Sequence, residues 1–153
     1  GTPSAGAEIG ELAWVEPSAP GERKIAPLSR WQILPMIAAL WKPVQREPGR
    51  HYTWGGDNDG WHLLQRHDLS VIAEHVPPGG REQRHHHGHA RQFFYLLGGR
   101  AVIELAGREV ALAAGQGLEI PPGLPHQFSN PFDEAVDFLV VSQPSTRGDR
   151  TDE

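Results

Sequence analysis

The sequence contains no cysteine among its 153 residues. Disulfide bridges, thiolate ligands to a metal ion and a cysteine nucleophile are therefore all excluded. Any metal ion that the chain binds must be held by nitrogen and oxygen atoms, which leaves histidine, carboxylate and amide side chains as the candidate ligands.

Long hydrophobic runs are also missing. The longest apolar stretch, residues 31–41, is interrupted by Gln32 and Pro35, and a helix that crosses a membrane needs about 20 apolar residues. Residues 1–20 lack the basic segment and following apolar run of a secretory signal. We therefore expect a cytoplasmic protein without a membrane partner.

Positive charge is not in excess. The chain has 14 Lys and Arg residues against 19 Asp and Glu residues, for a formal net charge of -5, and the basic residues are scattered along the sequence. Binding of nucleic acid depends on basic side chains gathered on one face. We therefore do not expect the protein to bind nucleic acid. The expected partner is a small-molecule ligand.

Glycine and proline are abundant, with 18 and 14 residues, which is too many for a helical protein of this length. The chain length suits one domain. Seven prolines fall within residues 1–50, so we interpret this part as an N-terminal arm. Residues 30–41 are its one candidate helix, which Pro35 would break or restart.

The arm carries large apolar side chains, including Trp14, Trp31 and Trp41. Such side chains must be buried, either on the chain's own folded domain or on a second subunit. Strand edges of a barrel also need cover. These two features lead us to expect a homodimer.

From about Tyr52 the pattern changes to short strands separated by turns. The apolar-rich runs and alternating stretches lie at residues 61–64, 69–76, 92–97, 100–105, 108–112, 117–120, 126–129 and 135–142. Ala106-Gly107 is a two-residue hairpin turn. We therefore predict an all-β sandwich or barrel over residues 51–144, followed by a flexible polar C-terminal tail, residues 145–153.

A histidine cluster, Arg84-His85-His86-His87-Gly88-His89, lies within the predicted barrel. On a strand, His85 and His87 point to one face and His86 to the other, so the first two could share a metal ion. A solvated polar loop is the alternative. His89 could also replace His85 in a shifted pair with His87.

The cluster is part of a longer pattern. The chain contains Gly79-x5-His85-x-His87-x4-Gln92-x6-Gly99 and, later, Gly115-x5-Pro121-x-Gly123-x2-His126-x3-Asn130. Together these resemble the two signature motifs of the cupin superfamily. The second motif matches at every defined position, whereas the first motif normally has Glu where this chain has Gln92.

The resemblance implies a cupin jelly-roll β-barrel with one divalent transition metal ion, such as Fe, Ni, Zn or Mn, near one end of its interior. His85, His87 and His126 would be the imidazole ligands and Gln92 the oxygen ligand. An amide carries no charge, so the ion would keep about two net positive charges. Alternatively, Gln92 does not coordinate and donates a hydrogen bond to a substrate.

Other candidate residues are less specific. Aromatic side chains could line a ligand pocket or form the core, and Phe94 and Phe128 are our candidates for substrate contact. The further aromatic residues are Tyr52, Trp54 and Trp61. The possible acid or base groups are Glu74, His75 and Tyr95, but Tyr95 has the opposite strand parity to Gln92 and should face away from the metal.

Three histidine nitrogens and one oxygen leave a coordination position open for substrate or water. We therefore expect a metal-dependent small-molecule enzyme, either an oxygenase such as a dioxygenase, and hence an oxidoreductase, or an isomerase. The alternative is a non-catalytic module that binds or senses a small molecule and keeps a structural metal. The sequence does not identify the substrate.

Overall fold

The computed structural model describes residues 33–40 and 42–153, which belong to two units divided between Pro43 and Val44. In the first unit the described residues form one helix, α1, Leu34–Leu40. Pro35 lies in its first turn, where a backbone N–H has no intrahelical acceptor, so the proline starts the helix instead of breaking it. Trp14, Trp31 and Trp41 lie outside the described residues. No described helix is long and apolar enough to cross a membrane.

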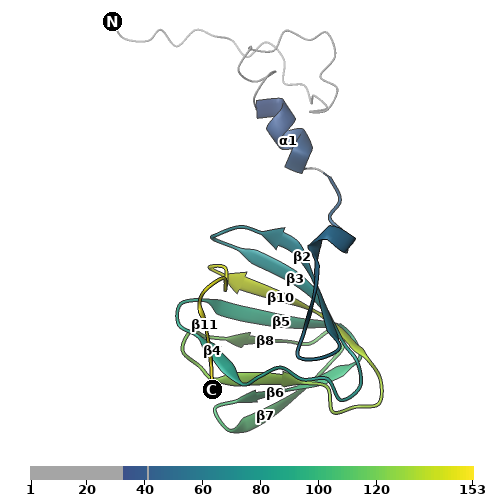
Figure 1. Cartoon of the computed structure of the whole chain (residues 1–153), viewed down its shortest axis with the longest axis vertical. Helices are drawn as coiled ribbons and strands as arrows, with labels where there is room; N and C mark the ends of the chain where they lie inside the picture. Colours follow the sequence, from purple (N-terminus) through teal and green to yellow (C-terminus); the bar gives the residue numbers. More distant parts are fainter. Residues whose placement is uncertain (1–32, 41) are drawn as a thin grey trace, which may run out of the picture. The chain divides into compact units, whose positions relative to one another are not determined.

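The second unit consists of two antiparallel sheets that face each other (Figure 1). This arrangement confirms the predicted all-β jelly-roll barrel. The first sheet has the order β1 (His51–Trp54), β2 (Asn58–Gln65), β3 (Ser70–Val76), β10 (Val136–Gln143), β5 (Arg91–Gly98) and β8 (Gly117–Ile120). The second has the order β11 (Arg150–Asp152), β4 (His85–His87), β9 (His126–Ser129), β6 (Arg100–Leu105) and β7 (Arg108–Ala113).

Side chains alternate between the interior and the outside of the barrel along β5 and β10. On β5 the even-numbered residues Gln92, Phe94 and Leu96 are buried and the odd-numbered ones are exposed. This is the two-residue period of a strand whose one face covers a core. The rings of Phe94, Phe128 and Phe138 stack in that core, with 4.2 Å between the ring centroids of the last two.

Tight turns fix the strands that carry the histidines. β6 and β7 are joined by Ala106-Gly107, with φ angles of 47° and 83°, which is the hairpin turn that the sequence predicts. Before β9, Gly123 has a φ of 75°, and its N–H donates a 2.7 Å hydrogen bond to the carbonyl oxygen of His87. This bond joins the turn that leads to His126 directly to β4.

The N-terminal boundary of the barrel unit differs from the sequence-based interpretation. The barrel unit begins at Val44, whereas the interpretation of the sequence places residues 1–50 in the arm. Arg46 forms a 2.7 Å ion pair with Asp137 on β10, and its guanidinium lies 4.7 Å from the ring centroid of Trp61 on β2. Residues 44–50 therefore pack as part of the barrel.

The polar composition of the C-terminal segment predicts a flexible tail, whereas the structure places this segment in a sheet. Arg150–Asp152 pairs antiparallel with β4, with Thr151 opposite His86. The Asp149 carboxylate accepts hydrogen bonds from the backbone N–H groups of His89 and Ala90. The polar composition of this segment could not predict that its backbone would pair with β4. The segment forms the edge strand beside the histidines.

Candidate metal centre

His85, His87 and His126 meet inside the barrel. β4 carries the first two and β9 the third, and His85 lies opposite His126 in the register of these strands. One ligand nitrogen of each histidine lies within 4.8 Å of the others. The three residues are 2%, 5% and 1% exposed, so this part of the cluster is not a solvated loop.

The other two histidines of the cluster lie elsewhere. The ring of His86 points to the opposite side of β4 and lies 3.2 Å from a carboxylate oxygen of Glu153. The His89 side chain is 86% exposed and forms an ion pair with Asp149. His89 therefore does not replace His85, and the alternative shifted pair is not formed.

Hydrogen bonds to backbone carbonyls fix the tautomer of all three buried histidines. The Nδ1 atom of His85 lies 2.9 Å from the carbonyl oxygen of Gln83, and that of His126 lies 3.0 Å from Leu124 O. His87 Nδ1 lies 3.3 Å from Asp149 O. A carbonyl oxygen only accepts hydrogen bonds, so each Nδ1 carries the proton. Each Nε2 then presents a lone pair, the form in which histidine binds metal.

Burial keeps the three imidazoles neutral. It lowers the pKa of His85 to about 3 and that of His126 to about 4, although the backbone hydrogen bonds act in the opposite direction. Burial also lowers the pKa of His87. Metal coordination requires deprotonated imidazole, so all three side chains are ready to coordinate at neutral pH.

Two buried atoms of the proposed ligand set have no hydrogen-bond partner among the described residues. They are His126 Nε2 and Gln92 Oε1, and both accept hydrogen bonds. An unsatisfied buried acceptor costs about 1–3 kcal/mol. A divalent cation would satisfy both, so the residues present fit a metal ion with nitrogen and oxygen ligands.

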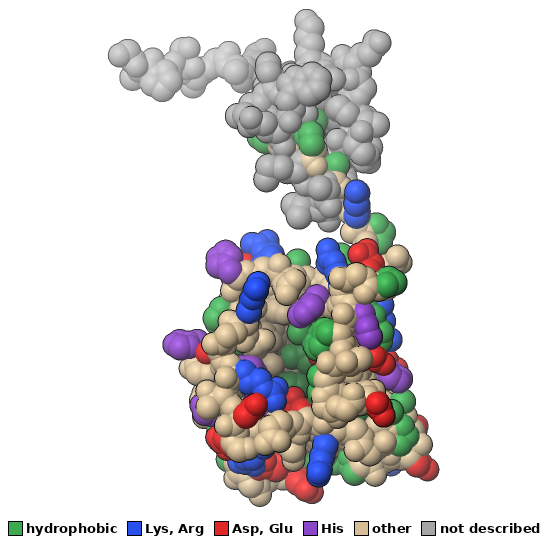
Figure 2. Space-filling view, viewed as in Figure 1, with side chains coloured by type: hydrophobic (Ala, Val, Ile, Leu, Met, Phe, Trp, Pro, Cys, Tyr) green, Lys and Arg blue, Asp and Glu red, His purple; other side chains and the backbone are tan. Residues whose placement is uncertain are grey.

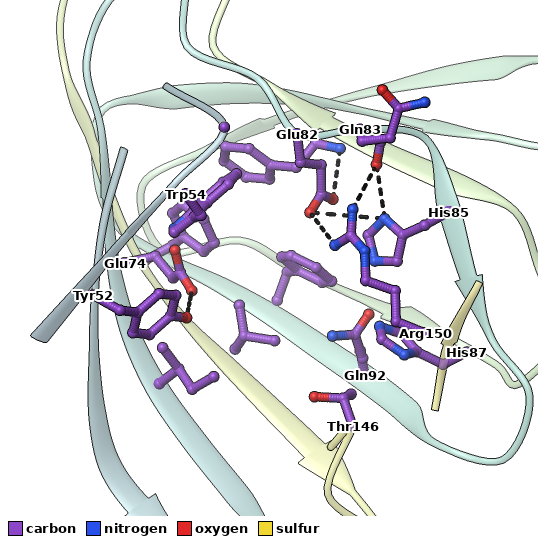
Figure 3. A pocket seen from close by; sticks show the side chains of 16 residues that line it. Tyr52, Trp54, Glu74, Glu82, Gln83, His85, His87, Gln92, Thr146 and Arg150 are labelled. Atoms are coloured by element: carbon purple, nitrogen blue, oxygen red, sulfur yellow. Dashed lines mark hydrogen bonds and ion pairs between the residues drawn. The ribbon is translucent and has the colours of Figure 1, made fainter. Parts of the chain in front are cut away.

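A cavity of about 310 Å³ adjoins the histidines (Figure 3). His85, His87 and Gln92 line one side of it, and Tyr52 and Glu74 line the other. Its apolar wall consists of Trp54, Ile72, Phe94, Phe128, Phe138 and Val140. The two phenylalanines that the sequence suggested for substrate contact thus belong both to the core and to the cavity wall. In Figure 2 the visible face of the barrel is hollowed, with hydrophobic side chains in the hollow.

Four further polar residues of the cavity were not identified from the sequence: Glu82, Gln83, Thr146 and Arg150. Glu82 accepts a 2.9 Å hydrogen bond from the N–H of Phe128, and its other oxygen lies 4.0 Å from Arg150 Nη1. Burial raises the pKa of Glu82 to about 7. Glu82 falls in an unspecified position of the first motif and Arg150 in the expected tail, so no signal marked either residue.

The remaining candidate residues have different environments. Tyr52 donates a 2.6 Å hydrogen bond to Glu74 inside the cavity. His75 lies outside it and bonds Asp137 at 3.2 Å. Tyr95 is 37% exposed on the outer face of β5, as its strand parity predicts. Trp61 does not line the cavity.

Comparisons with known proteins agree with the fold and the motifs. Residues 73–142 match the Cupin_2 family, described as a cupin domain. The chain is 40% identical over 67 residues to "Polyketide synthase CurC" of Streptomyces cyaneus, with 44% of each protein covered. The chain therefore spans under half the length of this curated relative.

Two solved structures show the same fold. A predicted oxalate decarboxylase from Thermotoga maritima is 21% identical with a TM-score of 0.62, covering 68% of this chain and 100% of that one. An uncharacterized Klebsiella pneumoniae protein with a double-stranded β-helix domain is 23% identical with a TM-score of 0.57, covering 72% and 90%. Residues 73–142 therefore form a cupin domain, and the two motifs and the fold agree with this assignment.

Proposed function

We propose that this cupin is a metal-dependent enzyme that acts on a small, largely apolar molecule bearing oxygen atoms. The observation that carries the proposal is the set of three Nδ1–carbonyl hydrogen bonds, which direct the Nε2 lone pairs of His85, His87 and His126 toward a common ion. The Oε1 atom of Gln92 is the proposed fourth ligand, because it is buried without a partner in the same cavity.

All four proposed ligands are uncharged, so the ion keeps its full charge. Iron, nickel, zinc and manganese are the candidate ions, because each accepts imidazole ligands. When bound, such an ion supplies Lewis-acid polarisation of a substrate oxygen or, for a redox-active metal, chemistry with dioxygen. Isomerase and dioxygenase reactions both fit this site, and of the two only the second makes the protein an oxidoreductase.

The cavity wall supports a mostly apolar substrate. Phe94, Phe128 and Phe138 provide flat aromatic surface. The cavity volume of about 310 Å³ lies at the small end of the range for ligand pockets. One relative is named a polyketide synthase. A small cyclic polyketide would match this wall, since it joins an apolar planar frame to ketone or hydroxyl oxygens. The structural neighbours support the fold and not the substrate.

The proposal is tested by measuring metal content and turnover together. Protein purified without added metal is analysed for its elements, stripped with a chelator and reloaded with each candidate ion. Oxygen consumption and product formation are then followed with cyclic 1,3-diketones and phenols. We expect turnover only with metal, and its loss in His87→Ala. The matched control is His86→Ala, on the same strand with its ring on the other face.

The outcomes separate the two function classes. Metal binding with ligand binding but no turnover on the panel would favour a sensing or storage module with a structural metal. Equal turnover in the stripped protein, or in His87→Ala, would contradict a metal-dependent enzyme. Stoichiometric metal in His87→Ala would contradict the ligand assignment itself.

We also propose that the protein is a homodimer. Phe93, Tyr95 and Leu97 on the outer face of β5 are 42%, 37% and 52% exposed, and a second copy would cover this apolar row. Sedimentation at micromolar concentration should give twice the monomer mass, and a monomer alone would contradict the proposal. The cytoplasmic location stays a prediction that cell fractionation can test.

A further inference from the structure

Tyr52, Gly60 and Glu74 form a row across three neighbouring strands. Tyr52 on β1 pairs with Gly60 on β2, and Gly60 pairs with Glu74 on β3. Residues paired across strands lie on the same face of a sheet. A Cβ atom added at Gly60 would overlap the ring of Tyr52. The absence of a side chain at Gly60 therefore lets the phenol ring cross β2 and reach Glu74.

The phenol binds only one of the two carboxyl oxygens. Tyr52 Oη donates a 2.6 Å hydrogen bond to Glu74 Oε1, whereas Glu74 Oε2 is buried without a partner among the described residues. Glu74 is 6% exposed and lines the cavity with Ile72 and Phe138. Figure 3 shows this pair on the far side of the cavity from His85 and His87.

The environment favours the protonated carboxyl. Burial and the nearby Glu82 raise the pKa of Glu74 to about 8, although the hydrogen bond from Tyr52 and the Trp54 indole N–H act in the opposite direction. A protonated carboxyl has one O–H donor. Because Oε1 accepts from Tyr52, Oε2 is the oxygen available to carry that proton. The donor then has no acceptor within the described protein.

We propose that Glu74, positioned by Tyr52, is a second polar subsite of the cavity that donates a hydrogen bond from Oε2 to an uncharged carbonyl oxygen of the ligand. The inference rests on the proposed function, since it assigns the far end of the same cavity. It specifies the ligand class as an aromatic or cyclic ketone or quinone. Such a ligand presents one carbonyl to Glu74 and its other oxygens to the histidines.

The probe is 1-tetralone, a bicyclic aromatic ketone, with tetralin as the probe that lacks the carbonyl. Dissociation constants are measured in wild type and in Glu74→Leu and Glu74→Gln. We expect Glu74→Leu to weaken tetralone binding about tenfold, the effect of one lost hydrogen bond, without weakening tetralin. Glu74→Gln should keep most of the affinity, since an amide N–H also donates.

Gly60→Ala provides a second route to the same contact. It leaves the carboxyl in place and displaces the phenol, so we expect weaker tetralone binding and unchanged tetralin binding. Glu109→Gln, an exposed carboxyl on β7, is the matched surface control. Circular dichroism and melting temperature establish that each variant is folded.

The pH dependence of binding distinguishes a donor from a bulky apolar contact. In wild type, tetralone affinity should fall as the pH is raised through about 8, and in Glu74→Gln it should not. Tyr52 and Glu82 are the other titratable groups that act on this carboxyl. If tetralone affinity still fell with rising pH in Glu74→Gln, the pH dependence would belong to Tyr52 or Glu82, and the proposal would be contradicted.

Metal dependence separates this subsite from the proposed metal centre. The binding measurements are repeated in metal-free protein and in His126→Ala. Tetralone binding that depends on Glu74 in both would support the subsite even if no metal-dependent turnover were found. Equal tetralone affinity in wild type, Glu74→Leu and Gly60→Ala would overturn the subsite and leave the metal proposal standing.

Discussion

His85 and His126 lie directly opposite each other on β4 and β9, with their ring centroids 4.3 Å apart. The pair joins residues that are 41 positions apart in the sequence, and His87 follows from the two-residue period of β4. Since each ring is anchored through Nδ1 to a carbonyl, their relative orientation is fixed before any ion binds. Such preorganisation lowers the cost of assembling a metal site.

Metal addition should therefore stabilise the folded protein. An ion present at 100 times its dissociation constant contributes about 2.7 kcal/mol to the free energy of unfolding. We expect zinc or manganese to raise the melting temperature of chelator-stripped wild type and of His86→Ala, but not that of His126→Ala. Equal stabilisation of His126→Ala would show that the ion binds elsewhere.

Gln92 determines the charge of the site. If its Oε1 atom is a ligand, Gln92→Glu adds a negative charge next to the ion and should strengthen manganese relative to zinc, because hard ions prefer carboxylate. Gln92→Ala should then weaken both ions. The exposed Gln143→Glu controls for added charge on the barrel. Competition titrations measure the selectivity.

The alternative role of Gln92 gives a different pattern. If its amide donates a hydrogen bond to a bound ligand, Gln92→Glu and Gln92→Ala should both keep the metal affinities of wild type and lose ligand affinity, since a carboxylate does not donate. Equal metal affinities in wild type, Gln92→Glu and Gln92→Ala would show that only the three histidines bind the ion.

Much of the barrel could be predicted from the sequence because its strands bury one face. On β6, Ala101 and Ile103 alternate with polar or half-buried neighbours, and the period of two is visible without knowing any partner strand. Strand parity places His85 and His87 on one face of a strand, and the resemblance of the two motifs to the cupin signatures implies that His126 joins them. Local patterns therefore identified the elements and one histidine pair, whereas the third proposed histidine ligand came from the resemblance.

Long-range register could not be predicted in the same way. Tyr52 reaches Glu74 only because Gly60 lies between them in two separate strand pairings. The local sequence specifies neither of these pairings. Arg150 enters the cavity only because the C-terminal segment pairs with β4. A polar segment of nine residues carries no period that distinguishes an edge strand from a loop.

Asp149 should stabilise the loop that follows β4. Its carboxylate accepts N–H bonds from His89 and Ala90, and its carbonyl holds His87 Nδ1. Asp149→Ala should lower the free energy of unfolding by about 1–3 kcal/mol and also weaken metal binding through His87. The exposed Asp133→Ala is the control. Chemical denaturation measures the difference, and equal stability of the two variants would contradict this role.

The contribution of Asp149 should also depend on pH. Burial would raise the pKa of its carboxyl, but hydrogen bonds from His89 and Ala90 outweigh this and lower the pKa to about 2. Its unfolded pKa is about 3.9. The stabilisation is therefore fully present above about pH 4 and is lost as the pH falls through about 2. Wild type and Asp149→Ala should approach each other in stability over that range.

Glu74 should have the opposite dependence, because its pKa in the folded protein is raised to about 8. In the unfolded chain the pKa of this carboxyl is about 4.3. Below that pH the carboxyl is protonated in both states, so its ionisation does not change the free energy of unfolding. As the pH rises toward 8 the unfolded chain loses a proton that the folded protein keeps. Wild type should then lose up to about 1.4 kcal/mol per pH unit relative to Glu74→Gln, which does not titrate.

Measuring both proteins by urea denaturation from pH 4.5 to 8 tests this directly, because the other titrating groups are common to both and cancel in the difference. The difference in the free energy of unfolding should grow steadily in favour of Glu74→Gln and level off near pH 8. Glu109→Gln should show what the loss of a surface carboxyl does over the same range. Parallel profiles for wild type and Glu74→Gln would mean that the buried carboxyl ionises as freely as in the unfolded chain, and Glu74 would then not be the protonated donor that the cavity subsite requires.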